Sequence, residues 1–221
     1  SMMPLEFPAT LGLDFSGVVS GLGDGVLGFK KGYEVYGQAG VFNHGSGTFA
    51  EFASAEPTRI ALKSKSVSHV ESAALPLVGV SAWQALMEHI NLSKGQKILI
   101  HGGAGGIGGV AIQLAKHLGA YVATTISSDK DYVKKLGADE VINYKEQDFE
   151  TVLSDYDAVF DTVGGDTYNR SFKVLKRGGI IVSMLEKNDS ELMERYSVKA
   201  ISQFTKVTGE ALKKLAELVD G

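Results

Sequence analysis

The pattern of hydrophobic and polar positions changes near residue 70. Before that point, short apolar segments rich in Val, Phe and Gly alternate with turn residues, which is typical of brief strands. The segments that we predict as strands are 15–19, 34–36 and 48–53. These strands are too few to close a barrel, so residues 1–70 are expected to form a partial, mostly β domain.

After residue 70, continuous apolar runs alternate with stretches of helical periodicity. The runs are typical of strands buried in a parallel sheet, and they cover 97–100, 121–125, 141–142, 158–160, 180–183 and 198–204. The helical stretches cover 73–90, 107–118, 128–136 and 166–175, with a final helix at 212–219. Because parallel neighbours are joined by right-handed helical crossovers, residues 71–221 are predicted to form an α/β domain with a doubly wound parallel sheet.

The amino-acid composition limits which class of protein the chain can belong to and which binding partners it can have. The 221 residues are 44% hydrophobic and 22% charged, with a net charge of −4, as in a soluble globular protein. This charge, without a basic run longer than two residues, argues against a nucleic-acid partner. No stretch approaches the ~20 apolar residues of a membrane span and no secretory leader opens the chain, so we expect a cytoplasmic protein without a membrane partner. The absence of Cys excludes disulfides and thiolate metal sites.

The most informative segment is 97–108, with the sequence KILIHGGAGGIG. It places a Gly-x-Gly-x-x-Gly pattern at Gly103, Gly105 and Gly108, after a predicted strand and before a predicted helix. In this context the first glycine forms a tight turn, the second lets the backbone approach a pyrophosphate, and the third lets helix and strand pack closely. N–H groups at the helix N-terminus add donors for the phosphates. The segment therefore predicts a dinucleotide-binding site.

The residues after the second strand of this domain indicate which dinucleotide binds. An NAD site usually carries an acidic residue about 20 positions beyond the loop, to bind the ribose hydroxyls. Here that place is occupied by Thr-Thr-Ile-Ser at 124–127, followed by Ser128 and Lys130. Hydroxyls and an ammonium suit a 2′-phosphate, so the sequence favours NADPH, although Asp129 weakens the case and Lys130 is also compatible with a solvated helix position.

With these features the chain resembles the zinc-independent quinone oxidoreductase (zeta-crystallin-like) branch of the medium-chain dehydrogenase/reductase superfamily. The segments that carry the resemblance are 11–19, 75–83, 95–108, 136–144 and 160–165, and they cover essentially the whole chain in order. The resemblance implies a Rossmann dinucleotide-binding domain at 71–221 and a partial GroES-like catalytic domain at 1–70.

The resemblance also implies which residues hold NADPH, while no catalytic residue is assigned. The pyrophosphate loop comprises Gly103, Ala104, Gly105, Gly106, Ile107 and Gly108. The 2′-phosphate contacts are expected from Ser127, Lys130 and Tyr144, although an aromatic residue just after a short strand, such as Tyr144, can also serve packing alone. The remaining cofactor contacts are expected from Ser81 near the nicotinamide and from Val163, Gly164, Ser183 and Met184.

Metal chemistry is not expected from this sequence. The zinc-dependent relatives carry Gly-His-Glu where this chain has Gly12-Leu13-Asp14, and they use cysteines that this chain lacks. His101 lies beside the glycine loop, where we expect a structural role for it.

The activity implied by the resemblance is NADPH-dependent transfer of hydride to a quinone or an electron-poor alkene, without zinc. The proton that the acceptor needs can come from water or from a hydroxyl such as Ser81 or Tyr36. Full-length relatives extend beyond both ends of this chain, so the sequence resembles a form truncated at both ends. The alternative is therefore an NADPH-binding module without productive catalysis, such as a sensor, a partner subunit or a fragment. An NADP-dependent alcohol dehydrogenase is disfavoured by the missing metal ligands. The predicted strand at 198–204 resembles the edge strand through which many family members form homodimers.

Overall fold

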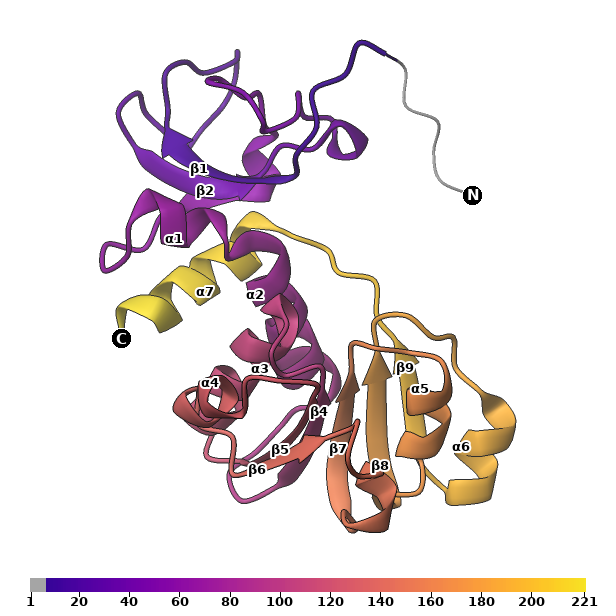
Figure 1. Ribbon diagram of the computed structural model, residues 1–221. Helices are drawn as coiled ribbons and strands as arrows, with labels where there is room; N and C mark the ends of the chain where they lie inside the picture. Colours follow the sequence, from indigo (N-terminus) through magenta and orange to yellow (C-terminus); the bar gives the residue numbers. More distant parts are fainter. Residues whose placement is uncertain (1–6) are drawn as a thin grey trace. The chain divides into compact units, whose positions relative to one another are not determined.

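A three-stranded antiparallel sheet and a six-stranded sheet organise residues 7–221, the part of the chain that the computed structural model describes (Figure 1). The described chain divides into two units, one formed by residues 7–80 with 206–221 and the other by 81–205. The domain boundary at 70/71 stays a prediction from the sequence; in the structure, residues 71–80 and the final helix group with the first unit. Residues 1–6 of the predicted first domain lie outside the described residues.

The first unit is built on strands β1 (Asp14–Val18), β2 (Glu34–Gln38) and β3 (Ile60–Leu62), in that order. Its short helical elements are η1 (Val41–Asn43), η2 (Pro57–Arg59) and α1 (His69–Ala73), and it shares α2 (Pro76–Trp83) with the second unit. The strand predicted at 48–53 is wrong, since this segment consists of bends, and β3 was not predicted. The partial, mostly β character of this region is confirmed.

Helix α7 (Gly209–Asp220) supplies much of the hydrophobic core of the first unit. Its buried Leu212 packs in one cluster with Tyr36 of β2 and Ala61 of β3. The hydroxyl of Tyr36 also donates a hydrogen bond to the carbonyl oxygen of Leu212. The apolar face of the final helix is therefore buried against the small sheet, which explains why the helix belongs to this unit.

The second unit contains the predicted doubly wound sheet, which is confirmed. All of its neighbouring strands are parallel, in the order β6-β5-β4-β7-β8-β9. The strands are β4 (Lys97–His101), β5 (Tyr121–Ile126), β6 (Glu140–Asn143), β7 (Tyr156–Asp161), β8 (Leu175–Ser183) and β9 (Lys199–Ser202). The helical elements are η3 (Gln84–His89), α3 (Gly106–His117), α4 (Lys130–Lys135), η4 (Phe149–Thr151), α5 (Asp166–Ser171) and α6 (Ser190–Tyr196).

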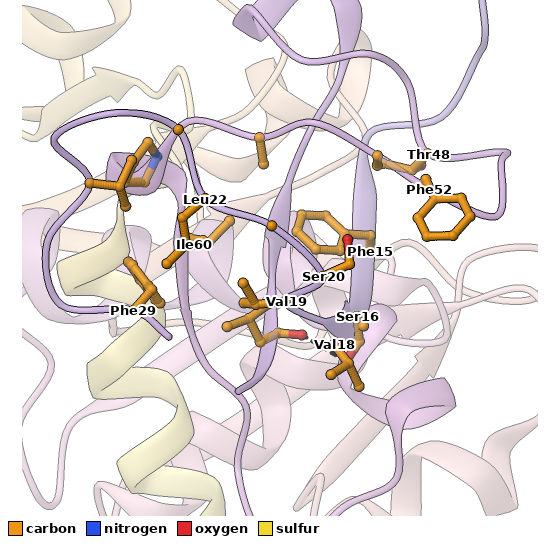
Figure 2. Close-up of a pocket in the computed structure, with 18 of the residues that line it drawn as sticks. Phe15, Ser16, Val18, Val19, Ser20, Leu22, Phe29, Thr48, Phe52 and Ile60 are labelled. Carbon is orange, nitrogen blue, oxygen red and sulfur yellow. Dashed lines mark hydrogen bonds between the residues drawn. The ribbon is translucent and has the colours of Figure 1, made fainter. Parts of the chain in front are cut away.

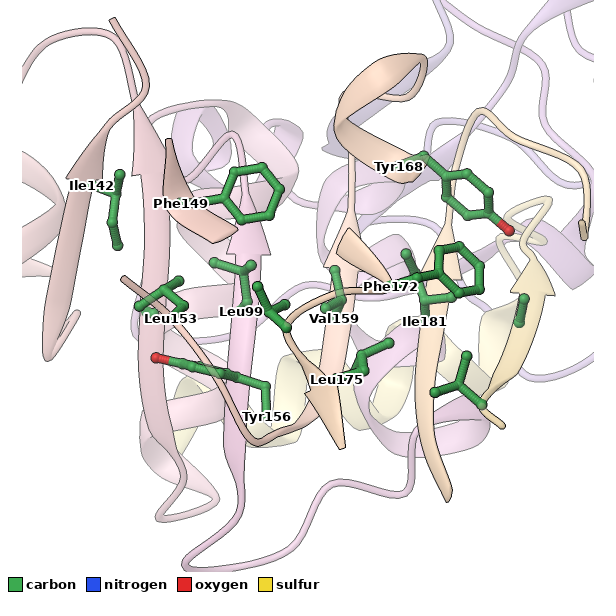
Figure 3. Close-up of a cluster of buried hydrophobic side chains, with 14 residues drawn as sticks. Leu99, Ile142, Phe149, Leu153, Tyr156, Val159, Tyr168, Phe172, Leu175 and Ile181 are labelled. Carbon is green, nitrogen blue, oxygen red and sulfur yellow. The ribbon is translucent and has the colours of Figure 1, made fainter. Parts of the chain in front are cut away.

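The chain order reverses between β4 and β7, which lie side by side in the middle of the sheet. In open α/β sheets this switch point is where ligands bind, at the carboxyl ends of the strands. The buried side chains of Leu99, Val159 and Ile181, from three central strands, form the base of a core cluster. Figure 3 shows Phe149, Tyr168 and Phe172 beside them, contributed by the segments that cover this face. This well-packed interior therefore fixes the positions of the central strands, whose carboxyl ends form the edge where ligands bind in such sheets.

Among the described residues, no helix combines the length and the hydropathy that a membrane crossing requires.

Candidate cofactor-binding site

The glycine loop between β4 and α3 is packed too tightly for side chains at two of its motif positions. A Cβ at Gly103 would collide with Oγ1 of Thr124, and one at Gly108 would collide with the carbonyl oxygen of Gly102. Gly102 adopts a φ of +71°, a region that favours glycine. These three constraints, at Gly102, Gly103 and Gly108, fold the chain back sharply from the end of β4 into α3.

The outer side of the same loop is open. Ala104, Gly105 and Gly106 are exposed, and the nearest atom to a Cβ on Gly105 would be the Gly102 carbonyl oxygen at 3.2 Å. Gly105 is the N-cap of α3, no side chain caps this end, and the first turn carries no acidic residue. Backbone N–H groups and the positive end of the helix dipole therefore face an accessible surface, to which a diphosphate group fits.

A polar pocket of about 470 Å³ lies at the carboxyl ends of β5 and β6. Its lining consists of Ile126, Ser128, Asp129, Lys130, Val141, Asn143, Glu146 and Gln147. Of the three residues predicted to bind a 2′-phosphate, only Lys130 lines this pocket. Ser127 is half-buried next to it, and Tyr144 is 55% exposed.

The charges of this pocket are mixed. Lys130 is accompanied by the carboxylates of Asp129 and Glu146. The Asn143 amide donates to Glu146 Oε1 at 2.6 Å, and the Ser128 hydroxyl donates to Asp129 Oδ2 at 3.1 Å. Sequence reasoning did not single out Asn143 or Glu146, and no motif in the segment 143–147 would have marked them.

The loops that follow β7 and β8 are tied together by the buried carboxylate of Asp161. Its Oδ1 accepts hydrogen bonds from the backbone N–H groups of Val163 and Gly164, both at 3.0 Å. Its Oδ2 accepts from the Ser183 hydroxyl at 2.7 Å. Ser183 Oγ in turn accepts from the N–H of Glu186 at 3.0 Å. The predicted residues Val163, Gly164, Ser183 and Met184 are thus brought to one edge of the sheet.

The side chains of these predicted residues differ in how far they are exposed at this edge of the sheet. Ser183 is fully buried and its hydroxyl is used within the protein, so it orients the loops. Val163 exposes an apolar side chain and Met184 is half-buried. Sequence reasoning missed Asp161, whose one signal is an acidic residue at the end of an otherwise apolar run, 158–161.

Ser81 lies in a second polar cluster of the same unit. It is buried in α2, with its Oγ 2.7 Å from Oγ1 of Thr205. The side-chain amide of Gln203 donates to the Ser81 carbonyl oxygen at 3.0 Å. Gln203 and Thr205 were not predicted as site residues, and their signal is the appearance of polar side chains at the end of the apolar run 198–204.

The contacts of the His101 side chain are those of a structural residue. Its ring nitrogens lie 2.9 Å from Thr125 Oγ1 and 2.8 Å from Ser171 Oγ, and its ring meets Phe149 edge-on. Burial lowers the pKa of the His101 imidazole to about 4, so the ring is neutral at pH 7. In the described part of the chain, no three His, Asp or Glu side chains gather into a group that could hold a metal ion.

The first unit contains a pocket of about 450 Å³ with a mixed polar and apolar lining (Figure 2). Phe15, Val19, Phe29, Phe52 and Ile60 contribute apolar lining, and Ser16, Ser20, Thr48 and Glu51 contribute polar lining.

Known proteins share both halves of this architecture. The family described as "Alcohol dehydrogenase GroES-like domain" matches residues 2–65, and that described as "Zinc-binding dehydrogenase" matches residues 106–208. The quinone oxidoreductase from Coxiella burnetii is 36% identical, with a TM-score of 0.83 over 96% of this chain and 68% of that chain. The Escherichia coli quinone oxidoreductase complexed with NADPH is 25% identical, with a TM-score of 0.84 over 99% of this chain and 72% of that chain.

The chain therefore belongs to the medium-chain dehydrogenase/reductase superfamily. Within it, one further relative is the 2-methylene-furan-3-one reductase of Solanum lycopersicum, 41% identical over 184 residues. That match covers 79% of this chain and 46% of the relative, so the chain spans about half the length of such curated relatives.

Proposed function

We propose that this chain binds NADPH and belongs to a zinc-independent oxidoreductase that transfers hydride to a quinone or an electron-poor alkene. The observation that carries the proposal is the glycine loop, which opens onto an uncapped α3 N-terminus beside the switch point of a parallel sheet. The names of the relatives, quinone oxidoreductase and 2-methylene-furan-3-one reductase, support the same acceptor classes.

The bound NADPH would supply the hydride, and the chain's own residues would bind and orient the cofactor. In this proposal the N–H groups of Gly106 and Ile107 hold the pyrophosphate. Lys130 and Ser128 attract the 2′-phosphate, with Ser127 and Tyr144 beside them, while Asp129 and Glu146 oppose it. The exposed Val163 and the half-buried Met184 cover apolar surface of the cofactor, and Asp161 with Ser183 keeps their loops in place.

Water is the proton source that fits these side chains best. The hydroxyl of Tyr36 is committed to the Leu212 carbonyl, and burial raises its pKa far above the physiological range. The Ser81 hydroxyl is paired with Thr205. Independence from zinc is supported by the absence of Cys and by Leu13 at the position of the family's zinc-side histidine. The cytoplasmic location and the homodimer expected from the sequence stay predictions.

The test is a calorimetric titration of the chain with NADPH and with NADH, followed by an oxidation assay with a small benzoquinone. Gly105→Ala is the diagnostic variant, because a methyl group there occupies the surface that a diphosphate must approach, while its nearest neighbour in the protein is the Gly102 carbonyl oxygen at 3.2 Å. Gly21→Ala is the matched control, since a Cβ at Gly21 meets nothing within 4 Å. We expect NADPH to bind more tightly than NADH, and Gly105→Ala to weaken NADPH binding at least about tenfold while the control does not.

The outcomes separate the two readings of the chain. Binding with turnover supports an active reductase. Binding without turnover supports the alternative, an NADPH-binding module whose catalysis needs further protein. If wild-type protein binds neither dinucleotide, the proposal is wrong.

A further inference from the structure

Gln203 carries a buried amide oxygen that has no donor. The residue directly follows β9 and is 5% exposed. Its Nε2 donates to the Ser81 carbonyl oxygen at 3.0 Å and lies 3.4 Å from Thr205 Oγ1. Its Oε1 is buried and has no hydrogen-bond partner among the described residues. Because buried polar atoms are nearly always paired in native proteins, this oxygen calls for a donor from outside the chain.

The orientation of the amide is fixed by its neighbours. Exchanging the nitrogen and the oxygen would place Oε1 against the Ser81 carbonyl, bringing two acceptors together. The hydroxyls of Ser81 and Thr205 lie 2.7 Å apart, so one of them donates a hydrogen bond to the other. In this orientation the side-chain oxygen of Gln203 is the acceptor in the cluster that has no hydrogen-bond partner among the described residues.

The position of Gln203 along the sheet indicates which ligand group it would meet. Its backbone N–H donates to the Ser183 carbonyl at 2.8 Å, which places it at the carboxyl ends of β8 and β9. The polar pocket described above lies on the other side of the switch point, at β5 and β6. A dinucleotide spans the carboxyl edge with its pyrophosphate at the switch point, so its two nucleoside halves lie on opposite sides of it. With the 2′-phosphate at β5 and β6, the nicotinamide half falls on the side of Gln203.

We propose that Oε1 of Gln203 accepts a hydrogen bond from the carboxamide N–H of the nicotinamide, an inference that rests on the proposed function. The carboxamide carries two N–H donors, which are the complement of a lone buried carbonyl. Anchoring this group fixes the rotation of the nicotinamide ring and thereby the ring face from which hydride leaves. Gln203 is then the residue that distinguishes a carboxamide from other substituents on the ring.

The experiment compares three ligands by calorimetry. NADP⁺ carries the carboxamide, its 3-acetylpyridine analogue has a ketone without N–H donors in that place, and 2′-phospho-ADP-ribose lacks the ring altogether. Gln203→Met is the diagnostic variant, because methionine has a similar length, suits a buried site and offers no amide oxygen. Phe204→Leu is the matched control, since it changes the neighbouring side chain, which is 88% exposed.

We expect wild-type protein and the control to bind NADP⁺ about tenfold more tightly than the acetylpyridine analogue. Gln203→Met should bind NADP⁺ about tenfold more weakly than wild type and no longer distinguish the two dinucleotides. Its affinity for 2′-phospho-ADP-ribose should be unchanged.

Equal losses for NADP⁺ and 2′-phospho-ADP-ribose would overturn the inference, because Gln203 would then act on the fold alone. If Gln203→Met still binds NADP⁺ about tenfold more tightly than the acetylpyridine analogue, another group recognises the carboxamide and the inference is overturned. If the variant does not fold, the wild-type comparison still decides, because equal binding of the two dinucleotides overturns the inference. In these cases the proposed function stands. Failure of wild-type protein to bind any of the three ligands would overturn the proposed function and this assignment together.

Discussion

Gly103 and Gly105 lie two positions apart in one loop and are constrained by different neighbours. Gly103 is enclosed by Thr124 and Ile112, whereas Gly105 is exposed and a Cβ there would meet only the Gly102 carbonyl oxygen, at 3.2 Å. The motif spacing predicts both positions equally well. Only the packing shows that the first glycine serves the fold and that the second is available to a ligand.

A pair of alanine variants separates these roles. Gly103→Ala should lower the free energy of unfolding by about 1–3 kcal/mol, because its Cβ forces Thr124 and the adjoining strand to move. Gly105→Ala should change it by less than about 1 kcal/mol. Urea denaturation followed by circular dichroism measures both, and equal stability of the two variants would contradict the packing argument.

His101 provides a prediction about pH. Its pKa is about 4 in the folded protein, below the ordinary histidine value of 6.5, because burial disfavours the charged ring. As the pH falls from 6.5 towards 4, His101 therefore becomes protonated in the unfolded chain but stays neutral in the folded chain. The associated stability is complete above pH 6.5 and is lost in this window, by up to about 3 kcal/mol.

The measurement is chemical denaturation at pH 7.0 and at pH 4.5, in wild type and in His101→Gln. Glutamine keeps polar atoms near Thr125 and Ser171 but cannot titrate. The loss of stability between the two pH values should be clearly smaller in the variant. A loss of the same size in both proteins would assign the acid sensitivity to other groups.

Residues that act through others were the ones that sequence reasoning missed. Asp161 has no motif of its own, and its role appears only when β7 and β8 are adjacent, so that Ser183 and the N–H of Gly164 reach it. Gln203 is similar, since its orphan oxygen exists only after Ser81 has taken its nitrogen. Such roles depend on contacts between distant positions in the chain, which a local pattern does not encode.

At the scale of elements, the segment 48–53 shows why composition can mislead. Its aromatic and small residues favour a strand. In the structure, however, the N–H groups of Thr48 and Phe49 both donate to the carbonyl of Leu11, each at 2.9 Å. Successive N–H groups of a strand point to opposite sides, so this pairing is incompatible with a ladder. The actual third strand, β3, is three residues long and too short to produce a clear pattern.

The final helix gives a prediction at the same scale. Leu212 is fully buried with Tyr36 and Ala61, so Leu212→Ala should destabilise the first unit by about 2–5 kcal/mol. The neighbouring Lys213→Ala should have an effect below about 0.5 kcal/mol, because its ion pair with Glu217 is exposed. Limited proteolysis and thermal unfolding report the difference, and similar behaviour of the two variants would contradict the place of α7 in this core.

At the scale of the whole molecule, the sheet was predictable because its signal is repeated along the chain. Each strand and each crossover helix supports the same interpretation, so errors of one or two residues at element ends do not change it. The division of the chain into two units was harder to predict from the sequence. The last helix follows the parallel sheet in sequence, but its apolar face is buried against Tyr36, far earlier in the chain.

The edge of that sheet carries the last prediction. β9 pairs with β8 on one side and has no strand on its other side within the described residues. Such an edge offers unpaired N–H and C=O groups to a second chain, and we predict a homodimer formed through residues 198–204. Because the N–H of Gln203 points to β8, the N–H of Ser202 points away from it, towards the expected partner.

Ser202→Pro removes this outward donor, whereas Ser202→Ala keeps it. Sedimentation at micromolar concentration should therefore find a dimer for wild type and Ser202→Ala, and a shift towards monomer for Ser202→Pro with its helix and strand content unchanged. A wild-type protein that sediments as a monomer would refute the dimer. If Ser202→Pro remains a dimer, the interface lies on another surface. The leading candidate is then the set of exposed apolar side chains around the pocket of the first unit.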